Sequence, residues 1–192
     1  LNNCMKLSTN INTIFLDRDG VINKDSGYIT KWSEFIFIEG VLDALIHLTK
    51  LEYKLIIITN QSAIARGFCT SEDFINLNKK MLNEFNIFGI KVTDVFFCPH
   101  HKDGVVDQYS MECNFRKPNP GMLLSAADKH NIDLSRSIIV GDKESDLLAG
   151  KNAKLHSCYL IRSSNPESPS ESIYAKEAFN NLNDFVFNFL CK

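Results

Sequence analysis

The sequence has no run of basic residues, and its 192 residues carry a formal net charge of only −2. Proteins that bind nucleic acid normally show a basic face or stripe, so nucleic acid is not an expected partner. No apolar run approaches the roughly 18 residues that suggest a membrane span. The first six residues hold no apolar core of a secretory signal, and a cytoplasmic location is therefore expected.

Cysteine is sparse and shows no pattern of pairing. Six cysteines occur, and four of them are scattered along the chain: Cys4, Cys69, Cys158 and Cys191. A reducing cytosol makes disulfides between them unexpected. Cys158 lies in an apolar run and is expected to be a small buried hydrophobic residue. Cys98 and Cys113 are considered separately below.

Short apolar runs rich in Ile, Val and Phe alternate with stretches of helical period. Strands are predicted at residues 13–16, 55–58, 92–97, 137–140 and 157–161. They lack the polar alternation of half-exposed strands, which indicates a parallel sheet covered on both faces. Helices are predicted at residues 40–51, 71–89, 122–130, 144–151 and, at the C-terminus, 173–192. The pattern predicts a three-layer, Rossmann-like α/β sandwich in a single domain over residues 1–192.

Two aspartates one residue apart follow the first predicted strand. Alternation along the strand points Asp17 and Asp19 the same way at its carboxyl end, where open α/β sheets bind ligands. Two carboxylates so close repel each other unless a cation lies between them, and Mg²⁺ with a phosphorylated substrate is a known solution. The alternative is an Asp-rich turn that closes a hairpin, since Asp-Gly is a strong turn signal.

Three further polar segments are candidates for the same site. The second strand ends in Thr59 and Asn60, which suit phosphate oxygens but also an ordinary helix cap. The Arg-Lys pair at 116–117 precedes a helix and is either a pair of phosphate-binding cations or a solvated surface pair. The fourth strand ends in Gly-Asp at Asp142, and a second carboxylate follows at Asp146.

The order of these four segments resembles the four motifs of the haloacid dehalogenase-like phosphatase superfamily, and the resemblance covers about residues 13–162. It implies that Asp17 is the nucleophile, which forms an aspartyl phosphate. It implies that Asp19 protonates the leaving alkoxide and later takes a proton from water. Mg²⁺ would be held by the Asp17 carboxylate, the Asp19 backbone carbonyl and the Asp142 carboxylate.

The same resemblance implies roles for residues around the transferred phosphate. Thr59, Asn60 and Lys117 would neutralise charge on its equatorial oxygens. Asp146 looks like a residue that orients Lys117 or metal-bound water, with a solvated helix-face acid as the alternative. Lys143 occupies a superfamily position near the substrate, and a surface role is equally open.

Finer features narrow the family. The stretch between the first two motifs is mostly used by one helix and one strand, so no large cap domain is expected. Four segments resemble the heptose bisphosphate phosphatases of bacterial cell-surface sugar synthesis: 17–23, 59–67, 98–101 and 116–123. The resemblance implies removal of the 7-phosphate of D-glycero-D-manno-heptose 1,7-bisphosphate, in the synthesis of nucleotide-activated heptose for lipopolysaccharide or capsule. Arg116 would contact the other phosphate of this substrate.

Three other functions remain as alternatives: a histidinol-phosphate phosphatase, a catalytically silent scaffold of the same fold, and a carrier that only binds phosphosugar. The intact acidic and lysine positions argue against the scaffold. A small sugar bisphosphate is the expected partner, and a monomer is expected because no long exposed apolar stripe demands a second chain.

The segment 98–115 resembles the zinc loop of this family with one ligand changed. Family members often carry Cys-x-His followed by Cys-x-Cys. Here Cys98, His100 and Cys113 match the first three ligands, whereas Phe115 replaces the fourth. Three ligands do not close a structural tetrahedron. Either Zn²⁺ is bound with a fourth ligand from elsewhere or from water, or the cysteines are ordinary thiols in a loop that packs through Phe115.

Overall fold

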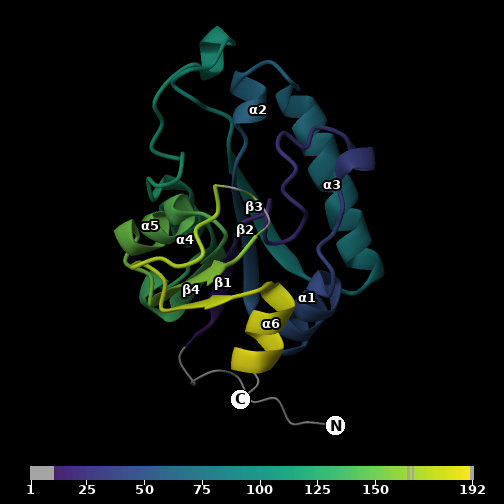
Figure 1. Ribbon diagram of the computed structural model, residues 1–192, viewed down its shortest axis with the longest axis vertical. Helices are drawn as coiled ribbons and strands as arrows, with labels where there is room; N and C mark the ends of the chain where they lie inside the picture. Colours follow the sequence, from purple (N-terminus) through teal and green to yellow (C-terminus); the bar gives the residue numbers. More distant parts are fainter. Residues whose placement is uncertain (1–10, 164, 166, 191–192) are drawn as a thin grey trace.

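The computed structural model describes residues 11–163, 165 and 167–190. Six parallel strands form one sheet in the order β3-β2-β1-β4-β5-β6. The strands are β1 (Thr13–Leu16), β2 (Lys54–Asn60), β3 (Val92–Cys98), β4 (Ser137–Gly141), β5 (Ser157–Ile161) and β6 (Glu177–Phe179). Helices cover both faces of the sheet (Figure 1), which confirms the predicted three-layer α/β sandwich without a large cap domain.

The helices divide between the two faces. They are α1 (Val41–Lys50), α2 (Ser62–Ala65), α3 (Ser71–Ile87), α4 (Gly121–His130), α5 (Glu144–Asn152) and α6 (Leu182–Phe185). In Figure 1, α1, α3 and α6 lie on one side of the sheet, and α4 and α5 lie on the other. Among the described residues, no helix combines the length and apolar character that a membrane crossing requires.

The two faces of the central strand β1 explain why it carries no polar alternation. Ile14 and Leu16 pack into the apolar cluster under α1, α3 and α6. Phe15 points to the opposite face and packs into the cluster under α4 and α5. Because successive side chains of a strand face opposite ways, a strand covered on both sides is apolar throughout.

The predicted C-terminal helix over 173–192 was wrong in extent. Within it, Glu177–Phe179 forms β6 and pairs in parallel with β5. The helix begins only after Asn181, whose side chain caps it by accepting a backbone hydrogen bond at 2.7 Å. The ring of Phe179 lies 5.3 Å from that of Phe185. A strand and a helix thus fill one apolar cluster, and together their residues mimic a single helical period.

Four of the six cysteines lie in the described part of the chain. Cys69, Cys98, Cys113 and Cys158 are free thiols, and Cys158 is buried as predicted. Cys4, Cys191 and the six N-terminal residues lie outside the described part of the chain, as do the last two residues of the predicted helix.

Candidate active site

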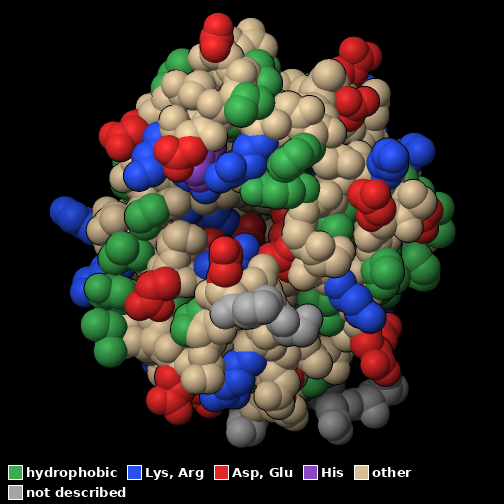
Figure 2. Space-filling view, turned by 45° about the horizontal axis from the view of Figure 1, so that its top comes forward, with side chains coloured by type: hydrophobic (Ala, Val, Ile, Leu, Met, Phe, Trp, Pro, Cys, Tyr) green, Lys and Arg blue, Asp and Glu red, His purple; other side chains and the backbone are tan. Residues whose placement is uncertain are grey.

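The site lies where the strand order reverses. β1 has β2 on one side and β4 on the other, so the carboxyl end of β1 opens into the crevice in which α/β sheets bind ligands. Asp17 follows β1, Thr59 lies near the end of β2, and Asp142 follows β4. A cavity of about 790 Å³ opens here. Figure 2 shows this hollow, with acidic side chains inside it and basic side chains at its rim.

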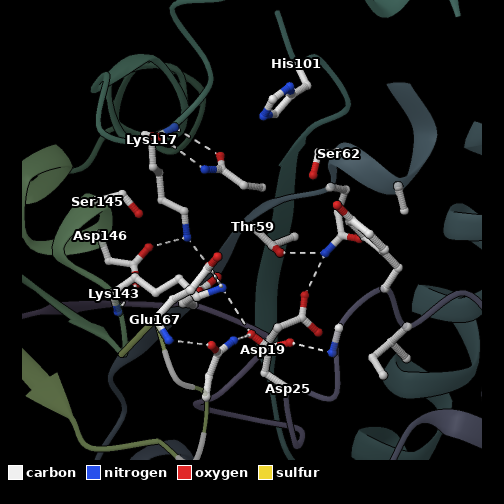
Figure 3. Close-up of a pocket in the computed structure, with 18 of the residues that line it drawn as sticks. Asp19, Asp25, Thr59, Ser62, His101, Lys117, Lys143, Ser145, Asp146 and Glu167 are labelled. Atoms are coloured by element: carbon white, nitrogen blue, oxygen red, sulfur yellow. Dashed lines mark hydrogen bonds and ion pairs between the residues drawn. The ribbon is translucent and has the colours of Figure 1, made fainter. Parts of the chain in front are cut away.

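The ammonium of Lys117 lies buried between two carboxylates (Figure 3). Its Nζ is 2.8 Å from Asp17 Oδ1 and 2.6 Å from Asp146 Oδ1, and it donates to the Ile58 carbonyl at 3.0 Å. Burial and the Asp146 carboxylate raise the pKa of Asp17, although Lys117 opposes them. Burial lowers the pKa of Lys117, but the two carboxylates outweigh it and leave that pKa raised. The three groups therefore form one charged unit in which the lysine stays protonated.

Asn60 and Thr59 are already engaged by neighbours in this structure. The Asn60 side-chain oxygen accepts from the Lys117 amide at 3.0 Å, and its nitrogen donates to the Lys117 carbonyl at 3.0 Å. Asn60 thus anchors the backbone that carries the lysine. The Thr59 hydroxyl accepts from Gln61 Nε2 at 2.8 Å. Both predicted residues lie at the cavity.

The Asp19 carboxylate faces a set of donors of its own. Arg18 Nη2 donates to Oδ1 at 2.9 Å, Asn23 Nδ2 donates to Oδ1 at 2.9 Å, and Gln61 Nε2 donates to Oδ2 at 2.8 Å. Burial raises the pKa of Asp19, but the Arg18 charge and these hydrogen bonds outweigh it and leave the pKa lowered. Arg18, Asn23 and Gln61 lie inside the segments 17–23 and 59–67 that resemble the family, but no contact with Asp19 was predicted for them.

Three carboxylates are suited to a cation. The ligand oxygens of Asp17, Asp142 and Asp146 lie within 4.8 Å of one another. Asp142 is fully buried, and its Oδ1 has no hydrogen-bond partner among the described residues. A buried carboxylate oxygen without a partner is costly, whereas a bound cation would satisfy it. Hard carboxylate oxygens are the donors that Mg²⁺ prefers, so the residues present fit this ion.

The cluster contains the two carboxylates that were predicted as ligands, Asp17 and Asp142, and adds Asp146. The third predicted ligand is the backbone carbonyl of Asp19, whose carboxylate is turned toward Arg18. Burial, followed by the nearby Asp146, raises the pKa of Asp142 to about 7, and a hydrogen bond from Ser163 lowers it. That bond, from Ser163 Oγ to Asp142 Oδ2, measures 2.7 Å. Ser163 lies in a segment for which no function was predicted.

The turn after β1 approaches Asp142 so closely that only glycine fits. Gly20 has a φ of +86°, in the left-handed region that favours glycine. A Cβ at this position would lie 2.2 Å from Asp142 Oδ2. The absent side chain therefore lets the first and fourth motifs meet.

Lys143 lies at the cavity but is paired with an acid. Its Nζ is 3.0 Å from Asp25 Oδ2. Burial lowers the pKa of Lys143, but Asp25 outweighs it and leaves the pKa raised. Asn165 also donates to this carboxylate. Asp25 and Asn165, neither predicted, thus form a polar wall with Lys143.

The rim of the cavity away from Asp19 is basic. Arg66, Arg116 and His101 line it, and Figure 3 places His101 well away from Asp19. Arg116 Nη1 donates to a backbone carbonyl at 3.2 Å, and Arg66 Nη2 lies 3.4 Å from His101 Nε2. Neither guanidinium forms an ion pair with a described carboxylate. Two such guanidiniums can accept a second anionic group.

The loop 98–115 brings together three zinc-type ligands and no fourth. The ligand atoms of Cys98, His100 and Cys113 lie within 4.8 Å of one another, and no other described His, Cys, Asp or Glu joins them. Phe115 is 37% exposed, so its burial gives little support to the alternative in which the loop packs through this ring. Burial raises the pKa of the Cys98 thiol to about 11. This donor set does not fit a closed structural zinc site.

The parallel sheet, the paired aspartates after β1 and the buried lysine define a haloacid dehalogenase-like phosphatase. A HAD-hydrolase-like family model matches residues 114–184. The D-glycero-beta-D-manno-heptose-1,7-bisphosphate 7-phosphatase of Vibrio cholerae is 42% identical over 171 residues, which cover 89% of this chain and 92% of that protein. The D-glycero-alpha-D-manno-heptose-1,7-bisphosphate 7-phosphatase of Photorhabdus laumondii is 41% identical over 163 residues, which cover 84% and 89%.

A solved structure agrees with these relatives. The D,D-heptose 1,7-bisphosphate phosphatase from B. bronchiseptica, crystallised with magnesium and phosphate, superposes with a TM-score of 0.81 at 30% identity, covering 94% of this chain and 98% of that one. The chain therefore belongs to the family of D-glycero-D-manno-heptose-1,7-bisphosphate 7-phosphatases, and the predicted class of enzyme is confirmed.

Proposed function

We propose that this protein is a Mg²⁺-dependent phosphatase that removes the 7-phosphate of D-glycero-D-manno-heptose 1,7-bisphosphate. One observation carries the proposal: the cavity has an acidic, lysine-containing end at Asp17 and a basic rim at Arg66 and Arg116. The first end suits the phosphate that reacts, and the rim suits a second phosphate on the same molecule. Relatives with this substrate in their names match most of the chain.

The chemistry follows from the arrangement of the acids. Asp17 Oδ attacks phosphorus, the bond from phosphorus to the sugar oxygen breaks, and the leaving oxygen takes a proton from Asp19. Asp19 then takes a proton from the water that hydrolyses the aspartyl phosphate. A bound phosphate dianion would raise the pKa of Asp19, so that this carboxyl keeps the proton taken from water and donates it in the first step of the next turnover. Thr59 and Lys117 neutralise the equatorial oxygens.

The cation belongs to the proposal as well. Asp17 and Asp142 would hold Mg²⁺, with the Asp19 backbone carbonyl as the third predicted ligand and Asp146 beside them. When bound, Mg²⁺ would neutralise part of the phosphate charge. We further propose that the enzyme is a monomer and is cytoplasmic. Its sugar 1-phosphate product would be consumed by a nucleotidyltransferase.

The substrate is tested by phosphate release in Mg²⁺ from four compounds: the α and β heptose bisphosphates, histidinol phosphate and a hexose 6-phosphate. We expect kcat/KM for one heptose bisphosphate to exceed that for histidinol phosphate by at least about tenfold, because only the bisphosphate reaches both ends of the cavity. Relatives named for the β and the α compound are 42% and 41% identical to this chain, so both anomers are assayed. Faster turnover of histidinol phosphate would replace this proposal by the alternative.

An Arg116→Gln variant sharpens the same experiment. Loss of a charged hydrogen bond to the second phosphate should raise KM for the bisphosphate about 10- to 100-fold. KM for the hexose 6-phosphate, which lacks that phosphate, should change by less than about twofold. An equal rise for both substrates would place Arg116 at the reacting phosphate instead.

We also propose that the loop 98–115 folds without structural zinc, and a single substitution tests this. Phe115→Cys should complete four ligands and give about one Zn²⁺ per chain after dialysis against EDTA, whereas the wild type should hold almost none. Elemental analysis by mass spectrometry measures the zinc. Phe115→Ser is the matched control, since it removes the ring without supplying a thiolate. Stoichiometric zinc in the dialysed wild type would contradict the proposal.

A further inference from the structure

Arg18, between the two aspartates, is the largest fully buried side chain in the described part of the protein, with 0% of its surface exposed. Its guanidinium donates three hydrogen bonds to the Asp19 carboxylate. Nε donates to Oδ1 at 3.1 Å, and Nη2 donates to Oδ1 at 2.9 Å and to Oδ2 at 3.0 Å. Asp19 itself lines the cavity. A buried cation thus holds an acid that faces the substrate.

This guanidinium is buried between two aromatic rings, and one of its nitrogens has no partner in the described part of the chain. Its Cζ lies 5.2 Å from the centre of the Phe74 ring and 5.8 Å from that of Phe35. Its Nη1 has no hydrogen-bond partner among the described residues. The faces of both rings attract the cation, but burying the unpartnered N–H group is unfavourable, and an apolar side chain here would avoid that cost. A choice that costs stability beside a reactive group indicates a role in function.

The contacts fix both the position and the plane of the carboxylate. Asn23 also donates to Oδ1 and Gln61 to Oδ2, at 2.9 and 2.8 Å. Among these donors only Arg18 Nη2 contacts both oxygens, and Arg18 Nε adds a second donor to Oδ1. A lysine would carry the charge on a single nitrogen, without the second donor and without the fixed plane of the guanidinium. Asp17, one residue before Arg18, is held by Lys117 instead, so the two neighbouring acids have separate supports.

We propose that Arg18 is a positioning residue that aims Asp19 at the leaving oxygen of the substrate. The inference rests on the proposed function. In the step concerned, Asp17 bonds to phosphorus while the bond from phosphorus to the sugar oxygen breaks, and that oxygen receives the Asp19 proton. An alkoxide is a poor leaving group and needs this proton, whereas p-nitrophenolate leaves as a stable anion without it. Misplacing Asp19 therefore slows the phosphorylation of Asp17 only with the first kind of substrate.

The test compares Arg18→Met with the wild type on the heptose bisphosphate and on p-nitrophenyl phosphate. The value of kcat/KM reports the steps up to phosphorylation of Asp17, so it isolates the proton donation from the later hydrolysis. We expect kcat/KM to fall about 100-fold for the sugar phosphate and less than about threefold for the aryl phosphate. Arg18→Lys, which keeps the charge but not the planar guanidinium, should give the same pattern with about a tenfold fall.

Phe74→Leu is the matched control, because it loosens the packing around Arg18 without removing a donor to Asp19. It should change kcat/KM for both substrates by the same factor. If Arg18→Met does not fold, Arg18→Lys decides the question by its leaving-group pattern. Equal losses on both substrates, or no loss on the sugar phosphate, would overturn the positioning role. A wild type inactive on every alkyl phosphate would instead overturn the proposed function.

Discussion

Asp17→Asn should lower phosphate release by about four orders of magnitude or more, the scale on which a covalent nucleophile contributes. The amide keeps the size and shape of the side chain but cannot attack phosphorus. Steady-state phosphate release from the bisphosphate measures the effect. Asp128→Asn, on the exposed side of α4, is the control for loss of one negative charge and should retain full activity.

The same substitution should not destabilise the fold. In the metal-free protein, burial and the neighbouring carboxylates raise the pKa of Asp17 despite Lys117. An acid whose pKa is raised in the folded state weakens folding at neutral pH, where it is ionised. A neutral isostere should therefore raise the melting temperature in EDTA. Full activity of Asp17→Asn, with asparagine verified by mass spectrometry, would mean that another group is the nucleophile.

The sequence could predict the parts of the fold that depend on local pattern. Continuous apolar strands such as 13–16 and 157–161 identified a sheet covered on both faces, and the structure has these two strands with the same bounds. The strand Glu177–Phe179 was missed because Phe179 enters the same cluster as the helix that follows. Periodicity alone cannot separate two elements that fill one core.

Site residues that directly follow a strand could be predicted from the sequence. Contacts that depend on the paths of loops could not. Asp17 and Asp142 follow neighbouring strands, so topology alone brings them together. Asp25 and Lys143, which form an ion pair, are 118 residues apart, and no periodicity links them. Asn60 shows a third limit. Its position was predictable, but its engagement with the Lys117 backbone depends on the path of a distant turn.

Lys117→Met should lower both the catalytic rate and the free energy of unfolding. The lysine is the cation that bridges Asp17 and Asp146, and it would contact the transferred phosphoryl group. Losing one preorganised electrostatic contact to the transition state should lower kcat about 10²- to 10³-fold. Leaving two buried carboxylates without their partner should lower the free energy of unfolding by about 3–5 kcal/mol, measured by urea denaturation in EDTA.

A double variant separates these two effects. Lys117→Met combined with Asp146→Asn removes the cation together with one of its acids, so less unpaired charge stays buried. We expect it to recover at least half of the lost free energy of unfolding but none of the lost activity, because the phosphoryl group still lacks its cation. The single variant Asp146→Asn keeps the ion pair between Lys117 and Asp17 and should fold. Recovery of activity in the double variant would show that Lys117 acts through stability and not through the substrate.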